Sequence, residues 1–230
     1  MKRYFPIFNL ILVLGLAILM LLPFCLMNPS ALAQGKGSRE PFKLPPPRYE
    51  SEVSIEKALL ERRSMRSYKE EPLTLNDLSQ ILWAAQGITE PKKGLRAAPS
   101  PRALYLLQVY VLPGNVTDLP MGTYRYEPQG HELVKTADGN KKAELFQAAG
   151  QAPIKNAPLA LVITGLSEKT QNPAWVYLEA GHVAENVYLQ SVSLKLGTVA
   201  MGGFKEDEVR KVLNLSEKER VLYIMPIGKK

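Results

Sequence analysis

The chain has 230 residues, of which 46% are hydrophobic, and it carries 29 Lys and Arg against 22 Asp and Glu. The net charge of +7 suits an anionic ligand, but no dense basic run indicates nucleic-acid binding. The only cysteine, Cys25, lies in an apolar N-terminal segment, which excludes a disulfide or a thiolate site in the rest of the chain.

Residues 1–33 have the pattern of a secretory signal peptide. Lys2 and Arg3 precede an apolar run over 10–22, and Ala31-Leu32-Ala33 is a small-x-small cleavage motif. Cleavage would export the remainder to the periplasm or the cell exterior and lower its net charge from +7 to +5. The alternative is a retained membrane anchor, because the wider apolar region nearly reaches the roughly 20 residues that span a bilayer. Both interpretations place the folded part outside the cytoplasm.

Residues 34–53 are rich in Gly, Pro and charged side chains and show no periodicity, which predicts an extended tether. A helix over 54–63 follows, with Ser54 as its N-cap. A second helix begins at residue 75, where leucines recur at helical spacing, and it ends at Gly87.

The remainder alternates strands and helices after a basic, irregular loop over 88–104. We expect strands at 106–112, 120–128, 131–136, 157–165 and 221–228, with the second and third forming a hairpin across Gln129-Gly130. Helices are predicted at 141–150, at 174–196 before Gly197, and at 206–213, with a short strand and turn over 198–204. This order predicts one α+β domain over 54–230.

Several kinds of catalytic site are excluded by the residues present. No G-x-S-x-G elbow occurs, and the two histidines are His131, in a predicted turn, and His182. Glu179 and His182 have the spacing of half a di-iron site, but no second pair completes it. We therefore interpret His182 as a buried helix histidine that is hydrogen-bonded to a neighbour, and we expect no metal. Without a P-loop or a G-x-G-x-x-G motif, any cofactor phosphate must be held by side chains.

Residues 61–68, ERRSMRSY, place three arginines and two serines at the end of the first predicted helix. The C-terminal end of a helix dipole is negative and disfavours an anion. A phosphate there would have to be bound by guanidinium groups and the Ser64 hydroxyl. The alternative is that the arginines complement their own helix end, and the cluster by itself leaves both interpretations open.

Five segments in order carry a resemblance to a known family: RRSMRSY, PLTLNDLSQILWAAQGIT, RAAPSPRALY, YLEAGHVAENVYLQSVSLKLGTVAMGGF and MPIG. From about Leu44 to Lys230 the chain resembles the FMN-dependent nitroreductase superfamily, and within it the branch of SagB-type and thiazole/oxazole-forming dehydrogenases. The resemblance implies an α+β fold with a central mixed β-sheet flanked by helices. It also implies an intertwined homodimer with FMN at the interface, so that each site takes residues from both chains.

The resemblance also assigns roles to individual residues. In relatives an R-R-S-x-R motif holds the FMN phosphate and ribityl chain, a Pro-Ser loop lies beside the flavin, and a final basic residue contacts the phosphate. A Met-Gly-Gly turn faces the ring, where glycine suits a close backbone approach because it lacks Cβ. The residues implied to bind FMN are Arg62, Arg63, Ser64, Arg66, Pro99, Ser100, Met201, Gly202, Gly203 and Lys229.

Two departures limit what the resemblance implies. Pro101 and Arg102 replace the small residues that usually follow the Pro-Ser pair, and a bulky cation there would narrow the flavin pocket or add an anion contact. Azoline-oxidising members carry a catalytic Lys-Tyr pair, whereas here Lys169 and Tyr177 are not adjacent. We expect an FMN-dependent oxidoreductase that passes electrons to a small acceptor such as a quinone or nitro compound, with no catalytic side chain identified. The alternatives are a non-catalytic flavin-binding protein and a dehydrogenase of azoline-modified peptides.

Overall fold

The structure is a computed structural model that describes residues 40–230. The chain divides into two units, Met1–Ser38 and Arg39–Lys230, and every described residue belongs to the second. The predicted signal peptide or anchor therefore lies outside the described residues, as does the first part of the predicted tether. Over 40–230, no helix combines the length and the apolar composition that crossing a bilayer requires.

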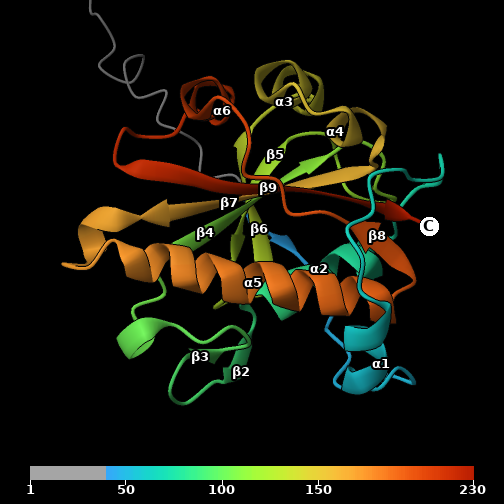
Figure 1. The fold of residues 1–230 in the computed structure, drawn as a ribbon, viewed down its shortest axis with the longest axis horizontal. Coiled ribbons are helices and arrows are strands. Elements are labelled where there is room, and N and C mark those ends of the chain that lie inside the picture. The colour runs from blue at the N-terminus through green and yellow to red at the C-terminus, as the bar shows by residue number, and fades with distance from the viewer. Residues whose placement is uncertain (1–39) are drawn as a thin grey trace, which may run out of the picture. The chain divides into compact units, whose positions relative to one another are not determined.

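A seven-stranded sheet forms the centre of the described unit, in the order β1-β6-β5-β4-β7-β9-β8 (Figure 1). All neighbouring strands pair antiparallel, and the parallel pairings are two isolated bridges, Ser64–Thr198 and Leu73–Val116. The predicted α+β fold is confirmed, and its parallel component is confined to these bridges. The strands are β1 (Phe42–Lys43), β4 (Leu107–Pro113), β5 (Thr123–Glu127), β6 (Glu132–Ala137), β7 (Leu159–Leu166), β8 (Leu196–Thr198) and β9 (Glu219–Lys229).

Helices cover both faces of the sheet (Figure 1). Alternate residues of the central strand β7 point to opposite faces, with Leu161 and Ile163 in one core cluster and Ala160 and Val162 in the other. The first cluster lies beneath α2 (Leu75–Gln86) and α5 (Ala174–Ser193), and α1 (Ile55–Glu61) packs against α5. The second lies beneath α3 (Lys142–Ala149), α4 (Ala152–Asn156) and α6 (Glu206–Leu213). Burial on both faces explains why β7 reads as a continuous apolar run.

The predicted helix ends near the arginine cluster are confirmed where a local side chain determines them. Ser54 caps α1, since its Oγ accepts the Lys57 N–H at 3.2 Å. A reciprocal capping box of Thr74 and Asp77 begins α2, and Gly87 ends it.

Other predicted boundaries were wrong. The helix α5 ends at Ser193, because Lys195 adopts a left-handed backbone with φ 58°, and Gly197 lies within β8. The predicted loop over 88–104 contains a separate hairpin, β2 (Ile88–Glu90) with β3 (Leu95–Arg96), and the 3-10 turn η2 (Pro101–Ala103). Strands of two or three residues are too short to show a hydrophobic period.

Residues 40–53 lie against the domain and do not form a free tether. The strand β1 pairs with β6, and Leu44 is buried. The Arg48 backbone exchanges two hydrogen bonds with the Gln80 side-chain amide, at 2.8 and 3.1 Å. The composition alone predicted a tether because these contacts depend on residues distant in the chain.

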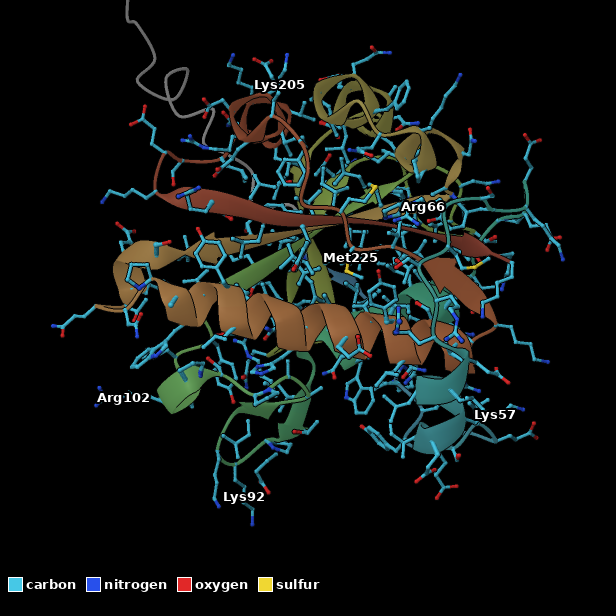
Figure 2. All side chains as sticks on the ribbon, in the orientation of Figure 1. Lys57, Arg66, Lys92, Arg102, Lys205 and Met225 are labelled. Atoms are coloured by element: carbon cyan, nitrogen blue, oxygen red, sulfur yellow. The ribbon has the colours of Figure 1, made fainter. Side chains whose placement is uncertain are left out.

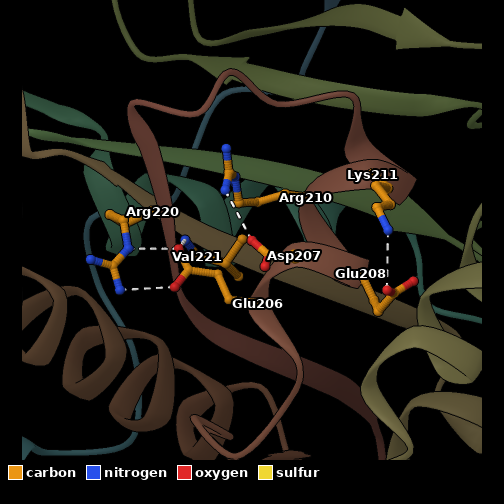
Figure 3. A network of polar contacts seen from close by, with 7 residues as sticks. All are labelled: Glu206, Asp207, Glu208, Arg210, Lys211, Arg220 and Val221. Atoms are coloured by element: carbon orange, nitrogen blue, oxygen red, sulfur yellow. Dashed lines mark hydrogen bonds and ion pairs between the residues drawn. The ribbon is translucent and has the colours of Figure 1, made fainter.

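Helix α6 is fastened to β9 by its first residue (Figure 3). Glu206 accepts two hydrogen bonds from Arg220, at 2.7 and 2.8 Å, and a third from the Val221 N–H at 3.2 Å. These bonds with Arg220 lower the pKa of Glu206 below its ordinary value. The clamp therefore fixes the start of α6 against β9.

Candidate functional site

The segment 64–69, which follows the first arginines, crosses the sheet edge formed by β8 and β9. Its backbone is bonded to both strands: the Met65 N–H donates to the Thr198 carbonyl at 2.8 Å, and the Lys69 N–H donates to the Lys229 carbonyl at 3.0 Å. The path of the segment is therefore determined by its backbone, which leaves the arginine side chains available for other contacts.

Two paired glycines let this segment approach the sheet. Gly197 of β8 lies opposite Gly228 of β9. A Cβ on Gly197 would lie 2.8 Å from the Met65 Cβ, and a Cβ on Gly228 would lie 2.7 Å from the Tyr68 Cβ. The Tyr68 hydroxyl donates to the Met65 carbonyl at 2.7 Å, and burial raises the pKa of Tyr68, so the phenol remains a neutral donor. Side chains at these two glycines would displace the arginine segment.

The arginines divide between the two interpretations that the sequence left open. Arg63 complements its own helix end, because its Nη1 donates to the carbonyls of Leu60 at 3.0 Å and Arg62 at 2.7 Å. The Arg62 guanidinium lies over the Tyr188 ring, 5.2 Å from its centroid. Neither Arg62 nor Arg66 has an ion pair within residues 40–230. Two of the three cations are thus free for an anion.

Tyr188 on α5 connects this cluster to the next strand segment. Its hydroxyl lies 3.0 Å from Ser64 Oγ and accepts the Ala200 N–H at 2.8 Å. No motif in the sequence marked Tyr188, although a tyrosine on a largely apolar helix is the available signal. The residue places Arg62, Ser64 and the start of the Met201 turn at one end of α5.

The turn over 201–203 presents open backbone. Met201 exchanges two backbone hydrogen bonds with Ile224, at 3.0 and 2.9 Å, and its side chain is buried. Neither Gly202 nor Gly203 has a positive φ, and a Cβ on them would lie no closer than 3.7 and 3.9 Å to a neighbouring atom. Neither backbone conformation nor contacts within residues 40–230 require glycine at these two positions, and the absence of Cβ leaves their backbone accessible to a flat group.

Lys229 lies beside the segment, but its charge has a partner. Its Nζ is 3.1 Å from Asp77 Oδ2, which belongs to the capping box of α2. A phosphate contact by Lys229 would therefore compete with a half-buried carboxylate.

The Pro-Ser loop is held against a different part of α5. Ser100 Oγ donates to Glu179 Oε2 at 2.6 Å and accepts the Tyr105 N–H at 2.8 Å. His182 Nδ1 lies 3.2 Å from the Pro99 carbonyl. His182 is exposed, so the predicted burial was wrong while the predicted hydrogen bond was right. It faces outward because sheet and helix contacts cover the other side of α5.

Glu179 accepts hydrogen bonds from three separate segments, a role that the sequence did not predict. It is fully buried and also accepts the Leu106 N–H at 3.2 Å and Gln86 Nε2 at 3.3 Å. Its carboxylate is occupied by these three donors, and no group of three or more potential ligands among residues 40–230 is placed to hold a metal. A carboxylate on an apolar helix face was the signal that could have identified it.

Arg102 continues this loop in a strained conformation. Its φ is 55°, and Ala103 and Tyr105 also have positive φ, at 53° and 48°. Arg102 is exposed and extends away from the fold at the outer edge of the molecule (Figure 2). Non-glycine residues in this region are strained and gather at functional sites.

Comparison with known proteins identifies the family. The family model described as "Nitroreductase family" matches residues 59–229. The chain belongs to the nitroreductase family. A protein of Methanocaldococcus jannaschii described as "Putative nitroreductase" is 41% identical over 186 residues, covering 78% of this chain and 92% of that protein.

Solved nitroreductases with the same description share the fold. A Ralstonia eutropha structure has a TM-score of 0.73 and 31% identity, and the match covers 84% of this chain and 90% of the other. A Desulfovibrio desulfuricans structure in complex with FMN has a TM-score of 0.57 and 18% identity, covering 77% and 87%. At that identity the second shows the fold alone.

In this nitroreductase-family chain the predicted site residues form two groups that α5 separates. Tyr188, which contacts Arg62 and Ser64, comes nine positions after Glu179, which holds the Pro-Ser loop. On an ideal α-helix that is about 13 Å and half a turn. The two groups also lie toward opposite ends of α5, where Figure 1 shows η2 and α1. Through Tyr188, one chain brings Arg62 and Ser64 together with the start of the Met201 turn, but it does not bring Ser100 to them.

Proposed function

We propose that this chain is an FMN-dependent oxidoreductase that transfers electrons through bound FMN to a small acceptor such as a quinone or a nitro compound. The observation that carries the proposal is the Arg62 guanidinium, which has no ion pair within residues 40–230 and shares Tyr188 with the Ser64 hydroxyl. Arg66 follows two positions after Ser64 and likewise has no ion pair over these residues. Gly202 and Gly203, whose backbone is open, come shortly after β8 in the chain. The arginine segment is hydrogen-bonded to this same strand.

These residues fit the two ends of FMN. Arg62, Arg66 and Ser64 offer charge-assisted and neutral donors for a phosphate dianion. Gly202 and Gly203 offer backbone without a Cβ to a planar ring. When bound, FMN supplies the redox chemistry, and the protein orients the ring and excludes water from it. Arg63 completes its own helix end and keeps the segment in register.

We further propose a homodimer in which the Pro-Ser loop of one subunit lies beside the arginine cluster of the other. Exposed apolar side chains support it on α1, where Leu59 and Leu60 are 55% and 74% exposed, and on α5, where Tyr177 and Leu178 are 55% and 58% exposed. Light scattering should give twice the chain mass. A Leu60→Asp, Leu178→Asp variant should be monomeric and lose FMN, whereas a monomeric wild type with full FMN occupancy would contradict the composite site.

Export is proposed from the leader in residues 1–33. Physiological donors outside the cytoplasm would then be a quinol or another redox protein rather than a nicotinamide cofactor. Cell fractionation with mass measurement of the N-terminus tests this, and a cytoplasmic chain that starts at Met1 contradicts it.

Within the family, we assign the chain to the SagB-type branch but not to its peptide-oxidising chemistry. Lys169 ends the 3-10 turn η3 (Ser167–Lys169), and Tyr177 lies on the exposed side of α5. They are eight positions apart in the sequence and form no adjacent base pair.

The test is the visible spectrum of the purified full chain. We expect flavin absorbance, release of FMN on denaturation, and oxidation of the anaerobically reduced protein by a quinone or a nitroaromatic. A colourless protein that also refuses added FMN would contradict the proposal. Flavin that no acceptor reoxidises would instead favour a non-catalytic flavin-binding protein.

A further inference from the structure

A small polar cavity lies between the β2–β3 hairpin and the ends of β4, β5 and β7, and the Pro-Ser loop contributes Tyr105 to its lining. Its volume is about 190 Å³. Clefts that hold drug-sized ligands are about 300 Å³ or larger, so this cavity suits an ion or a very small acid. Its polar lining includes Arg96, Tyr105, Gln108, Arg125, Glu127 and Lys169.

The charges around the cavity are unbalanced. Arg125 forms an ion pair with Glu127 at 2.5 Å, which neutralises one cation. Arg96 and Lys169 have no ion pair with any residue over 40–230. The wall of the cavity therefore carries an excess of two positive charges.

Arg96 is held in position without being neutralised. Its Nη1 donates to the Gln86 side-chain oxygen at 2.9 Å, and its guanidinium lies 4.3 Å from the centroid of the Tyr105 ring. Its Nε is buried and has no hydrogen-bond partner. Burial lowers the pKa of Arg96 from its ordinary value. The carboxylates of Glu179 and Glu127 act on Arg96 in the opposite direction, but neither forms an ion pair with it, so no carboxylate among residues 40–230 contacts this half-buried guanidinium directly.

Tyr105 adds a neutral donor at the same wall. Its hydroxyl oxygen accepts the Arg96 backbone N–H at 3.1 Å. The O–H proton then remains free to donate to a ligand oxygen. A planar guanidinium, an ammonium and a phenol around a small cavity are the donors that recognise an oxyanion.

We propose that this cavity binds a small oxyanion, either inorganic phosphate or a carboxylate of up to four carbons, through Arg96, Lys169 and Tyr105. The ligand supplies the direct anionic contact that Arg96 lacks within residues 40–230. The site is distinct from the FMN phosphate cluster, since none of its lining residues belongs to the segment 62–69.

Isothermal titration calorimetry of the full chain tests the proposal, with inorganic phosphate, acetate and succinate added at constant ionic strength. We expect saturable binding of at least one of the three at one site per chain. Lys169→Gln should weaken it about tenfold, the value of one charge-assisted hydrogen bond, and Arg96→Gln should abolish it. Lys92→Gln, an exposed cation elsewhere with the same charge change, should leave it unchanged.

The variant Arg62→Ala, Arg66→Ala separates this proposal from the proposed FMN site, and it should retain the binding. Preference for phosphate or for a carboxylate identifies the ligand class. No saturable heat with any of the three anions would overturn the proposal. Equal affinities in the Lys169→Gln and Lys92→Gln variants, or loss of binding in the Arg62, Arg66 variant, would also overturn it. Since Lys169 is exposed and unpaired, its variant remains informative if Arg96→Gln does not fold.

Discussion

The two segments that the family resemblance assigns to FMN are held in opposite ways. The arginine segment, 64–69, is fixed by backbone hydrogen bonds to β8 and β9 and lies over paired glycines. The Pro-Ser loop, 99–105, is held by a side chain, the Ser100 hydroxyl, which donates to the buried carboxylate of Glu179, and the following Leu106 N–H donates to the same carboxylate. The loop contains three non-glycine residues with positive φ.

This difference determines what a mutation can report. Arginine side chains can be removed from a backbone-held segment without changing its path, so their loss reports on ligand binding. The Pro-Ser loop is different, because removing the Glu179 carboxylate on α5 would change both the stability of the fold and the position of the loop.

The largest effect is expected at the side-chain anchor. Glu179→Ala leaves the donors of Ser100, Leu106 and Gln86 without an acceptor, which should lower the free energy of unfolding by about 3 kcal/mol. Denaturant titration measures it, with Glu185→Ala on the same helix as the control. Equal stabilities of the two variants would show that Glu179 does not anchor the loop.

The arginine segment, 64–69, can be displaced by a substitution at one of the glycines beneath it. Gly228→Ala places a Cβ 2.7 Å from the Tyr68 Cβ, and such overpacking costs about 1–3 kcal/mol. FMN occupancy should fall as the segment shifts. Gly181→Ala is the matched control, because nothing lies within 4 Å of its Cβ position and alanine favours helix. Unchanged stability and occupancy in Gly228→Ala would remove the glycine argument.

Strain in the Pro-Ser loop predicts a stabilising change. Arg102→Gly replaces a residue at φ 55° by one that adopts this conformation freely, which should raise the free energy of unfolding by about 1 kcal/mol. Arg102→Lys, which keeps the charge and the strain, should not. If both variants gain equally, strain is not the cause.

The smallest effect concerns His131, which holds residues 40–53 to the domain. Its Nε2 lies 2.7 Å from Ser79 Oγ and 3.1 Å from the Pro45 carbonyl, and Nδ1 lies 2.8 Å from the Tyr126 hydroxyl. Burial lowers its pKa below 6.5. As the pH falls, His131 therefore binds a proton at a higher pH in the unfolded chain than in the folded chain. The free energy of unfolding should fall as the pH drops from 6.5 toward the folded-state pKa.

His131→Asn should remove this slope, and asparagine tolerates the positive φ of 45° at this position. The same substitution at the exposed His182 should leave the slope intact. Denaturant titrations across the pH window measure both variants. An unchanged slope in His131→Asn would assign the pH dependence to other groups.

Local signals in the sequence predicted much of the fold. Ser54, Gly87 and the Gln129-Gly130 turn act on neighbouring residues, so their effects were readable in advance. The predicted end of α5 was wrong because Lys195 adopts the left-handed conformation that glycine usually takes. Gly197 instead leaves room for Met65 of the arginine segment.

The site was predictable from the sequence only in part. The three arginines within eight positions could be recognised as a cluster. That Arg63 binds its own helix end, while Arg62 lies over the Tyr188 ring, could not be predicted, because Tyr188 is distant in the chain. The role of Glu179 likewise depends on three donors that other segments bring to it.

The affinity for FMN of Arg62→Ala, Arg66→Ala, measured beside Lys92→Ala, Lys93→Ala, tests the central claim most directly. Both pairs remove two exposed or half-exposed cations, and Figure 2 shows Lys92 far from Arg66. Losing two charge-assisted hydrogen bonds of about 1.5 kcal/mol each should weaken FMN binding about a hundredfold or more. The first variant should lose FMN while its free energy of unfolding falls by no more than about 1 kcal/mol, the value of the cation–π contact between Arg62 and Tyr188, and the second should keep its FMN and its stability. Equal FMN affinities in the two variants would contradict the proposal that the arginine segment holds the phosphate.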